Sequence, residues 1–294
     1  MKQLYTRSSC PLCGNSDFHH VMEVQDHMIS KEVFHIVKCE KCDFHFTNPI
    51  PLESEIGNYY KHESYVSHSS SNKGVINKLY NLIRKRTLKQ KVRLIQSLVS
   101  KGTVVDYGCG TGHFLNELKN VNYQVYGFEP DADARTFTQT QFGIQTQPLS
   151  SFDELRNDSI DVITMWHVLE HVYHLKRDFG KLVSKLKPGG YMVVAVPNHT
   201  SADATRYKSF WAAYDVPRHL YHFAPNDINA LASEFQLTVE QILPMKFDSY
   251  YVSMLSEKYK NGNLLNAFFA GLFSNLKAKK GTYSSQIYIL KSHS

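Results

Sequence analysis

The sequence predicts an α/β fold built around a doubly wound, mostly parallel sheet. Between residues 101 and 197, apolar stretches with strand composition alternate with segments of helical periodicity, the order that a parallel sheet needs. Polar or glycine-rich residues follow several of these strands, at the sheet edge where open α/β folds bind ligands. Two Cys-x-x-Cys pairs near the N-terminus predict a small additional module.

The stretch VVDYGCGTGHF, residues 104–114, carries the main ligand-binding pattern. Two valines lead into Asp106, and a turn follows in which Gly108, Gly110 and Gly112 alternate with other residues. Glycine lets the backbone turn sharply and leaves room for a ligand. A helix expected to begin near Phe114 directs its N-terminal N–H groups to the same place. The pattern departs from the dinucleotide fingerprint G-x-G-x-x-G at His113, so by itself it predicts only a nucleotide site.

Further polar residues are expected where later strands end. A short strand over Gln124–Phe128 ends in Glu129, about 20 residues beyond the glycines, where a carboxylate can accept both ribose hydroxyls of a nucleotide. The segment GIQTQPLSSF predicts a third strand. This strand is expected to end near Leu149, beside the adenine ring of a bound nucleotide. Asp161–Met165 predicts a fourth strand, and LKPGGYMVVAVPN predicts a Pro-Gly-Gly turn and a fifth strand.

In this order the segments resemble the motif set of class I S-adenosylmethionine (SAM)-dependent methyltransferases: D-x-G-x-G-x-G, the acidic end of strand two, D-V-I-x-M-x-x-V-L-E-H-V and L-K-P-G-G. The resemblance covers about residues 75–240. It implies a seven-stranded, Rossmann-like methyltransferase sheet with an antiparallel last strand, and it places Trp166 and His167 beside the cofactor. With residues from the linker, the expected SAM site comprises Tyr60, Tyr65, Asp106, Gly108, Cys109, Gly110, Gly112, Phe114, Glu129, Pro130, Leu149, Trp166 and His167.

One competing motif overlaps the strand-four segment. His167-Val-Leu-Glu170-His171 matches H-x-x-E-H, a pattern of zinc hydrolases. That interpretation requires a longer helix with further ligands nearby, whereas these residues come directly after a predicted strand. The methyltransferase interpretation is therefore favoured, and Glu170 and His171 are expected to hold the end of the following helix.

Residues 1–50 predict a zinc-ribbon module. Cys10 and Cys13 form one knuckle and Cys39 and Cys42 form the second, so that four thiolates can complete a tetrahedron around one zinc ion. The residues between the knuckles alternate like two strands of a hairpin. Four thiolates leave no open position for water, which indicates a structural ion. Metal binding is expected to supply folding energy on the order of 10 kcal/mol.

Residues 51–100 are expected to form a linker and a basic amphipathic helix. Tyr60 and Tyr65 lie in a polar stretch and either cover a bound cofactor or anchor a solvated linker. From Val75 to Val99 an apolar stripe repeats at helical spacing. Its basic residues form either a solvated face or a surface for RNA or an acidic substrate: Arg84, Lys85, Arg86, Lys89, Lys91 and Arg93.

Residues 101–294 are expected to form the methyltransferase domain, with a substrate-binding insertion at 198–224. Asp215, Arg218, His219, Tyr221 and His222 cluster in this insertion, next to the edge where the sheet binds ligands. The segment resembles the R/E-H-L-x-x-F segment of zinc-ribbon-bearing methyltransferases that act on sugar nucleotides, and of relatives that act on quinone-like small molecules. The resemblance implies that His219 is the general base; alternatively, His219 only ties the insertion to the sheet.

Composition and charge limit the partners. The net charge of +6 over 294 residues is mild for a dedicated nucleic-acid-binding protein. No apolar run reaches the roughly 20 residues that span a bilayer, and the paired cysteines are typical of metal binding, so a cytoplasmic protein without a transmembrane segment is expected. The segment LLNAFFAGLFSNLKAKK is expected to be a core or cap helix, with a membrane-surface or dimer contact as the alternative.

Three functions follow, in order of preference. The first is SAM-dependent methyl transfer to a small molecule or to a glycan or lipid intermediate, by in-line displacement with a histidine base. The second is an rRNA or tRNA methyltransferase that contacts RNA through the zinc module and the basic helix. The third is a non-catalytic SAM-binding module. The sequence leaves open which atom of the acceptor, oxygen, nitrogen or carbon, receives the methyl group.

Overall fold

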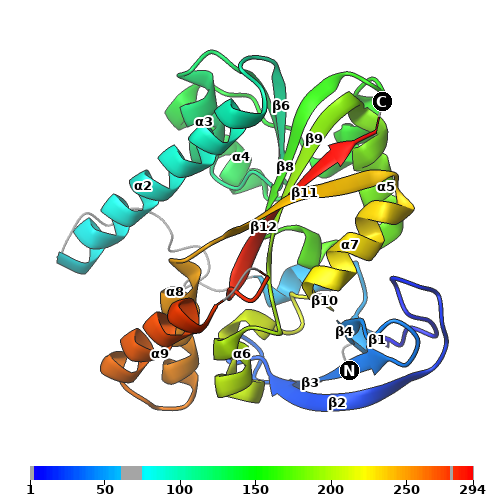
Figure 1. Ribbon diagram of the computed structural model, residues 1–294, viewed down its shortest axis with the longest axis vertical. Helices are drawn as coiled ribbons and strands as arrows, with labels where there is room; N and C mark the ends of the chain where they lie inside the picture. The colour runs from blue at the N-terminus through cyan, green and yellow to red at the C-terminus, as the bar shows by residue number, and fades with distance from the viewer. Residues whose placement is uncertain (1–2, 61–74, 279–280, 294) are drawn as a thin grey trace.

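A six-stranded mixed sheet forms the centre of the protein, as seen in a computed structural model that describes residues 3–60, 75–278 and 281–293 (Figure 1). The strand order is β11-β12-β9-β8-β6-β7. The four strands from β9 to β7 are parallel, and β12 runs antiparallel to both of its neighbours. The strands are β6 (Thr103–Tyr107), β7 (Gln124–Phe128), β8 (Ile160–Trp166), β9 (Leu186–Pro197), β11 (Leu237–Pro244) and β12 (Ser285–Ser292).

The sequence prediction of seven strands is wrong at the third position, while the antiparallel last strand is confirmed. Gln147 makes a single parallel bridge to Phe128, and its N–H donates to the carbonyl of Gly127. Pro148 then has no N–H to continue a ladder, and the chain turns into the 3₁₀ helix η2 (Leu149–Glu154). The turn buries the Phe152 ring, which lies edge-on to Phe128 at 5.1 Å.

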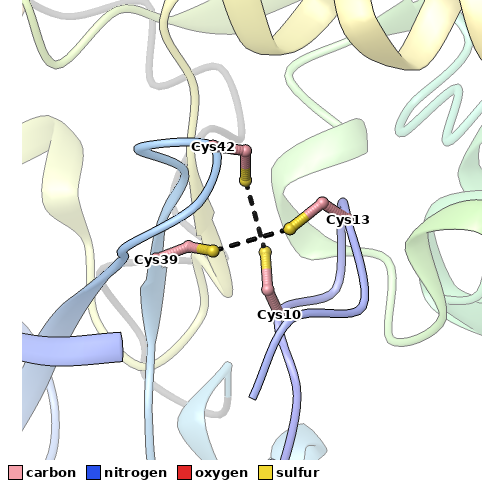
Figure 2. Close-up of side chains that lie close together, drawn as sticks. All are labelled: Cys10, Cys13, Cys39 and Cys42. Carbon is pink, nitrogen blue, oxygen red and sulfur yellow. Dashed lines mark hydrogen bonds between the residues drawn. The ribbon is translucent and has the colours of Figure 1, made fainter. Parts of the chain in front are cut away.

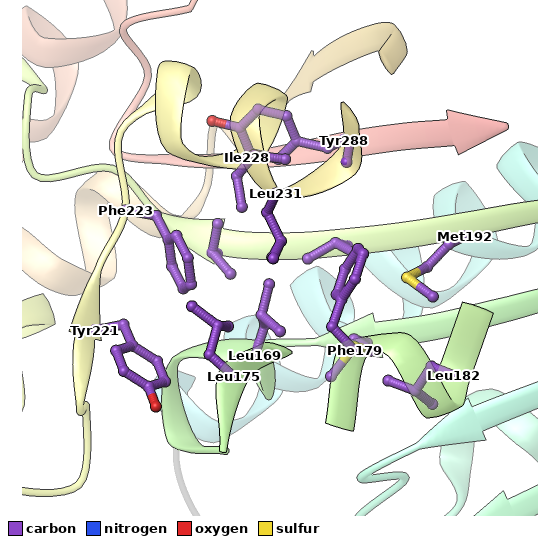
Figure 3. Packing of buried hydrophobic residues seen from close by; sticks show 14 of the residues in the cluster. Leu169, Leu175, Phe179, Leu182, Met192, Tyr221, Phe223, Ile228, Leu231 and Tyr288 are labelled. Atoms are coloured by element: carbon purple, nitrogen blue, oxygen red, sulfur yellow. The ribbon is translucent and has the colours of Figure 1, made fainter. Parts of the chain in front are cut away.

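Helices cover both faces of the sheet because alternate strand residues point to opposite sides. On one face Met192 and Val194 of β9 pack against α5 (Leu175–Lys185) and α7 (Pro225–Glu234), whose Phe179 and Leu231 fill the layer (Figure 3). On the other face Val193 packs with side chains of α2 (Val75–Leu98) and α3 (His113–Lys119). The helix α4 (Ala132–Phe142) follows β7. This arrangement confirms the doubly wound plan.

The N-terminal region forms a second sheet of order β10-β4-β3-β2. The expected hairpin between the cysteine pairs is present as β2 (Phe18–Gln25) and β3 (Val33–Cys39), and β4 (His45–Thr47) follows. The fourth strand, β10 (Tyr221–His222), comes from the insertion and pairs antiparallel with β4. A two-stranded pair of β1 (Leu4–Tyr5) and β5 (Ile50–Pro51) lies beside this sheet. The cysteine-bearing region and the insertion therefore share one sheet.

A buried arginine strengthens this junction. Arg218 is 1% exposed, and its Nη2 donates to Asp26 Oδ1 at 3.0 Å and to Asp215 Oδ1 at 2.6 Å. Its Nη1 donates to the carbonyl of Tyr59 at 3.0 Å. Burial opposes ionisation of Asp26, but the hydrogen bond and the charge of Arg218 outweigh it and lower the pKa of that carboxyl. The three segments that meet here lie far apart in the sequence, at residues 26, 59 and 215–218.

The remaining helices complete the insertion and the C-terminal part. The insertion contains α6 (Ala202–Tyr207) and two short 3₁₀ turns, η4 (Lys208–Phe210) and η5 (Ala212–Tyr214). Between β11 and β12 the chain forms a hairpin of α8 (Asp248–Tyr259) and α9 (Leu264–Lys277), which lies beside α6 at the lower left of Figure 1. Among the described residues, no helix is long and apolar enough to cross a membrane.

Replacing Asp26 with alanine should lower the free energy of unfolding by about 3–5 kcal/mol, because it leaves part of a buried guanidinium uncompensated. Chemical denaturation measures the change. Asp17→Ala is the control, since Asp17 is exposed in the same N-terminal region and its substitution should change stability by less than about 0.5 kcal/mol. Equal losses for the two variants would contradict a structural role for the Asp26–Arg218 contact.

Candidate active site

The glycine loop after β6 combines tight packing with open space. All three glycines have positive φ: 75° at Gly108, 52° at Gly110 and 69° at Gly112. An added Cβ at Gly108 would lie 2.5 Å from Val168, and one at Gly112 would lie 2.3 Å from Thr138. At Gly110, no described atom beyond its chain neighbours lies within 4 Å of such a Cβ. Gly108 and Gly112 are thus required by packing, whereas Gly110 borders a space that a ligand can occupy.

The acidic residue at the end of β7 lies against this loop, as its spacing predicts. Glu129 is 8% exposed, and its Oε2 accepts a hydrogen bond from the N–H of Gly110 at 2.8 Å. Its Oε1 accepts from the N–H of Asp131 at 3.0 Å. Burial raises the pKa of Glu129, while these two backbone donors act in the opposite direction. Arg135 donates to the carbonyls of Glu129 and Pro130, both at 2.7 Å, and fixes the strand end.

Asp106, near the end of β6, and Lys91 of α2 are two ionisable groups that interact electrostatically. Asp106 is 2% exposed and accepts a hydrogen bond from Thr164 Oγ1 at 2.6 Å, and burial raises its pKa to about 7. Lys91 of α2 holds its Nζ 4.0 Å from the centroid of the Trp166 ring. Burial lowers the pKa of Lys91 to about 8, while the carboxylates of Asp106 and Asp248 act in the opposite direction. The sequence counted Lys91 only as part of a basic helix face.

Trp166 itself provides a donor for a ligand. Its indole Nε1 is buried and has no hydrogen-bond partner among the described residues. A buried N–H without an acceptor costs about 1–3 kcal/mol, which a ligand acceptor would recover. Phe114, expected to touch the cofactor, is 5% exposed and meets Trp166 edge-on with 5.5 Å between the ring centroids. In the structure Phe114 supports the Trp166 ring from the core side.

The other residues predicted to bind the cofactor do not all lie near the glycine loop. Cys109 is half-buried in the loop, and its N–H donates to the carbonyl of Phe128 at 3.0 Å. Leu149 is half-buried at the start of η2. The hydroxyl of Tyr60 lies 2.9 Å from His171 Nδ1, which places it beside the insertion. Tyr65 lies outside the described residues.

His167 is held by a carboxylate on each ring nitrogen. It follows β8 with φ of +57°, and its Nδ1 lies 3.3 Å from Glu170 Oε1 while its Nε2 lies 3.0 Å from Asp248 Oδ2. Burial disfavours the imidazolium, but the two carboxylates outweigh it and raise the pKa of His167 to about 10. His167 is therefore a cation at neutral pH. The sequence did not indicate Asp248, because it belongs to a helix 81 residues further on.

Glu170 and His171 do not hold a helix end, and that prediction is wrong. They lie in the 3₁₀ turn η3 (Leu169–His171), and the next residue, Val172, is extended, so α5 begins only at Leu175. Glu170 is fully buried, and its Oε2 has no hydrogen-bond partner among the described residues. His171 Nδ1 lies 3.0 Å from the carbonyl oxygen of Arg218, and burial with the nearby His219 lowers the pKa of His171 to about 4. The H-x-x-E-H motif therefore lacks the helix that the zinc-hydrolase interpretation requires.

The insertion brings His219 to this group. Its Nδ1 lies 2.8 Å from the carbonyl of Ala213, and its Nε2 lies 4.0 Å from both Glu170 Oε1 and Asp215 Oδ2. His219 is 8% exposed, and its ring is edge-on to His171 with 4.6 Å between centroids. Glu170 contacts both His167 and His219, so it links the end of β8 with the insertion.

The four paired cysteines form a compact cluster, shown in Figure 2. Sγ of Cys10 lies 3.7 Å from that of Cys42, and Sγ of Cys13 lies 3.5 Å from that of Cys39. All four sulfur atoms lie within 4.8 Å of one another. A tetrahedron with Zn–S bonds of 2.3 Å has edges of about 3.8 Å, so these residues fit a zinc site. Cys109, the fifth cysteine, is not part of the cluster.

The fold and the glycine loop are those of α/β proteins that bind a nucleotide-like ligand at the carboxyl ends of their strands. The sequence profile of a family described as a methyltransferase domain matches residues 80–242, more than half of the chain. The chain belongs to this family, and it is a SAM-dependent methyltransferase. This membership favours an enzyme over the non-catalytic binding module.

Known relatives agree with this assignment. A ubiquinone biosynthesis O-methyltransferase of Rickettsia bellii is 24% identical over 192 residues, which are 60% of this chain and 80% of that protein. A SAM-dependent methyltransferase from Archaeoglobus fulgidus has a TM-score of 0.52 at 18% identity and covers 71% of this chain and 94% of its own. The magnesium protoporphyrin IX methyltransferase of Synechocystis has a TM-score of 0.54 at 14% identity, with coverage of 82% and 100%. These structures share the fold.

Gly110→Ala should weaken binding of S-adenosylhomocysteine by tenfold or more, a change of about 1.4 kcal/mol, because the new methyl group enters the open space at the loop. Isothermal titration calorimetry measures the affinity. Gly143→Ala is a matched control: Gly143 also has a positive φ, 60°, with no described atom near an added Cβ, but it caps α4 away from the loop. Unchanged affinity in Gly110→Ala would contradict a ligand at this position.

Proposed function

We propose that this enzyme transfers the methyl group of SAM to an oxygen atom of a small-molecule acceptor, with His219 as the general base. When bound, SAM supplies an activated methyl group, so the protein must position the acceptor and remove its proton. The observation that carries the proposal is the hydrogen bond from His219 Nδ1 to the carbonyl of Ala213. This bond places the proton of the neutral ring on Nδ1 and leaves the lone pair on Nε2.

The neighbouring histidines are less suited to this role. His167 is held as a cation by Glu170 and Asp248, so it has no lone pair for an incoming proton. His171 is half-buried, its Nδ1 lies near both the Arg218 carbonyl and the Tyr60 hydroxyl, and a pKa of about 4 makes it a weak base. His219 instead has carboxylates on two sides of Nε2, both at 4.0 Å. A proton accepted at Nε2 would therefore lie between two carboxylates.

The arrangement also links the acceptor side to the cofactor side. The glycine loop, Glu129 and Trp166 would hold SAM, with Lys91 supplying a positive charge beside the Trp166 ring. His167 follows Trp166 directly and contacts Glu170, which in turn faces His219. One buried carboxylate thus separates the proposed base from the residues at the end of β8. The relatives named as O-methyltransferases support oxygen as the accepting atom.

Substitution of His219 with alanine should lower kcat by roughly 10²–10⁴, the usual contribution of a positioned general base. Transfer of radiolabelled methyl from SAM to the acceptor fraction of a cell extract measures the rate, and calorimetry checks that SAM binding is retained. His174→Ala is the control, because His174 is exposed and pairs with Glu53 at the surface. A loss of less than about tenfold with SAM binding intact would reduce His219 to a structural residue.

The acceptor can also be a glycan or lipid intermediate, and the same assay separates these from small molecules by fractionation. The RNA alternative rests on basic residues near one another on α2, which line a shallow surface hollow: Lys85, Arg86, Lys89 and Arg93. An RNA methyltransferase would place the label in the RNA fraction and bind RNA with strong salt dependence. Label in the small-molecule fraction supports the proposed acceptor class.

The cysteine cluster is proposed to bind one structural zinc ion. Its support is the match between the observed sulfur separations and the edges of a ZnS₄ tetrahedron. Cys10 and Cys39 are buried in the main apolar cluster, so the ion would cross-link two loops of the N-terminal region from within the core.

Cys39→Ser should abolish bound zinc and lower the melting temperature, because three thiolates cannot complete the tetrahedron. Inductively coupled plasma mass spectrometry of the purified protein measures the metal content. Cys109→Ser, which removes the one cysteine outside the cluster, should retain zinc. Zinc retained in Cys39→Ser, or absent from the wild-type protein, would refute the site.

A further inference from the structure

The helix α9 presents its apolar residues in the reverse of the usual order. Its buried positions carry small residues: Ala267, Ala270, Gly271 and Ser274. Its exposed positions carry large apolar side chains: Leu264, Leu265, Phe268, Phe269, Phe273 and Leu276. At 100° per residue Leu265, Phe269, Phe273 and Leu276 fall on the face opposite the small residues. Phe268 lies at the edge of that face, and Leu264 is exposed at the start of the helix. A helix that serves only as a core or cap element would bury the large residues instead.

Close packing fixes this orientation. Helices α8 and α9 lie side by side (Figure 1), and an added Cβ at Gly271 would come within 2.9 Å of the Tyr250 Cα. Ser249 Oγ donates to the carbonyl of Gly271 at 3.1 Å. On the same face, Ser274 Oγ donates to Asp203 of α6 at 2.7 Å. Small side chains and buried hydrogen bonds therefore hold α9 with its phenylalanines outward.

The outward face is large and continuous. Exposed fractions reach 72% at Leu265, 61% at Phe269 and 75% at Leu276. Three partly exposed side chains at the start and along α8 add to the apolar surface of the hairpin: Phe247, Tyr251 and Met254. Contiguous apolar patches of this kind mark sites that contact another surface.

The charges around this face are positive. Four exposed lysines lie at the ends of the two helices: Lys246, Lys258, Lys260 and Lys277. The hairpin's two acids point elsewhere, since Asp248 pairs with His167 and the buried Glu257 accepts from Tyr207. An apolar helix face bordered by lysines complements an anionic bilayer, where the side chains enter the acyl boundary and the lysines meet the headgroups. In a symmetric dimer the same lysines would face one another and repel.

We propose that the α8–α9 hairpin docks this enzyme on the surface of a bilayer containing anionic lipids, with α9 lying in the interfacial plane. In the described part of the chain, no helix is long and apolar enough to span a membrane. The proposed contact is a peripheral one. The proposal does not depend on the identity of the methyl acceptor or on the role of His219.

The test is co-sedimentation of the full chain with vesicles of phosphatidylcholine, alone or mixed with phosphatidylglycerol. The wild-type protein should bind the anionic vesicles more tightly, and added salt should weaken that binding because the lysine contribution is screened. Phe269→Ser combined with Phe273→Ser should weaken binding on the order of 100-fold, since the bilayer would no longer bury two exposed phenylalanine side chains. The matched control is Val33→Ser with Val121→Ser, which removes two exposed apolar residues from other elements and should bind like the wild type.

Circular dichroism first establishes that each variant remains folded. Failure of the wild-type protein to bind anionic vesicles would overturn the proposal, as would equal binding by the phenylalanine variant. Sedimentation velocity tests whether a second copy of the chain covers this face instead. If the wild-type chain forms dimers that the phenylalanine substitutions dissociate, and it does not bind vesicles, the face is an interface between two copies and the bilayer proposal is wrong.

Discussion

The buried guanidinium of Arg218 is the interaction on which the organisation of this protein depends. It is held by Asp26 from the cysteine-bearing sheet, by Asp215 from the insertion and by the carbonyl of Tyr59. A cation this deeply buried is tolerated only because carboxylates compensate it. The next residue, His219, therefore takes its position from contacts that join segments almost two hundred residues apart. The N-terminal sheet therefore helps to position His219 in the candidate acceptor site.

A second constraint separates the proposed cofactor and acceptor sides of the candidate active site. On the cofactor side, glycines with positive φ make a loop that Glu129 supports through the N–H of Gly110. On the acceptor side, three histidines share the buried carboxylate of Glu170. Burial and neighbouring charge give these rings different protonation states, with His167 cationic and His171 neutral. Chemically similar residues can thus take different roles within a few ångströms.

Much of the fold, and the placement of Glu129 against the glycine loop, could be predicted from the sequence, because both depend on local patterns. Strand and helix periodicity, the glycine spacing and the position of Glu129 are written over short stretches of chain. The prediction of a third strand is wrong because Pro148 and the burial of Phe152 override strand propensity. Lys91, Asp248 and the true positions of Glu170 and His171 were missed, because their partners come from distant elements.

The sequence by itself determined the class of the protein, most elements of its central α/β fold and the two Cys-x-x-Cys motifs, since these follow from patterns over short stretches of chain. Only the tertiary structure decided which side chains meet. It joined the insertion to the cysteine-bearing sheet through β4 and β10, oriented the lone pair of His219, and turned the phenylalanines of α9 outward. Those outcomes depend on burial and on hydrogen bonds between remote segments, which no local pattern encodes.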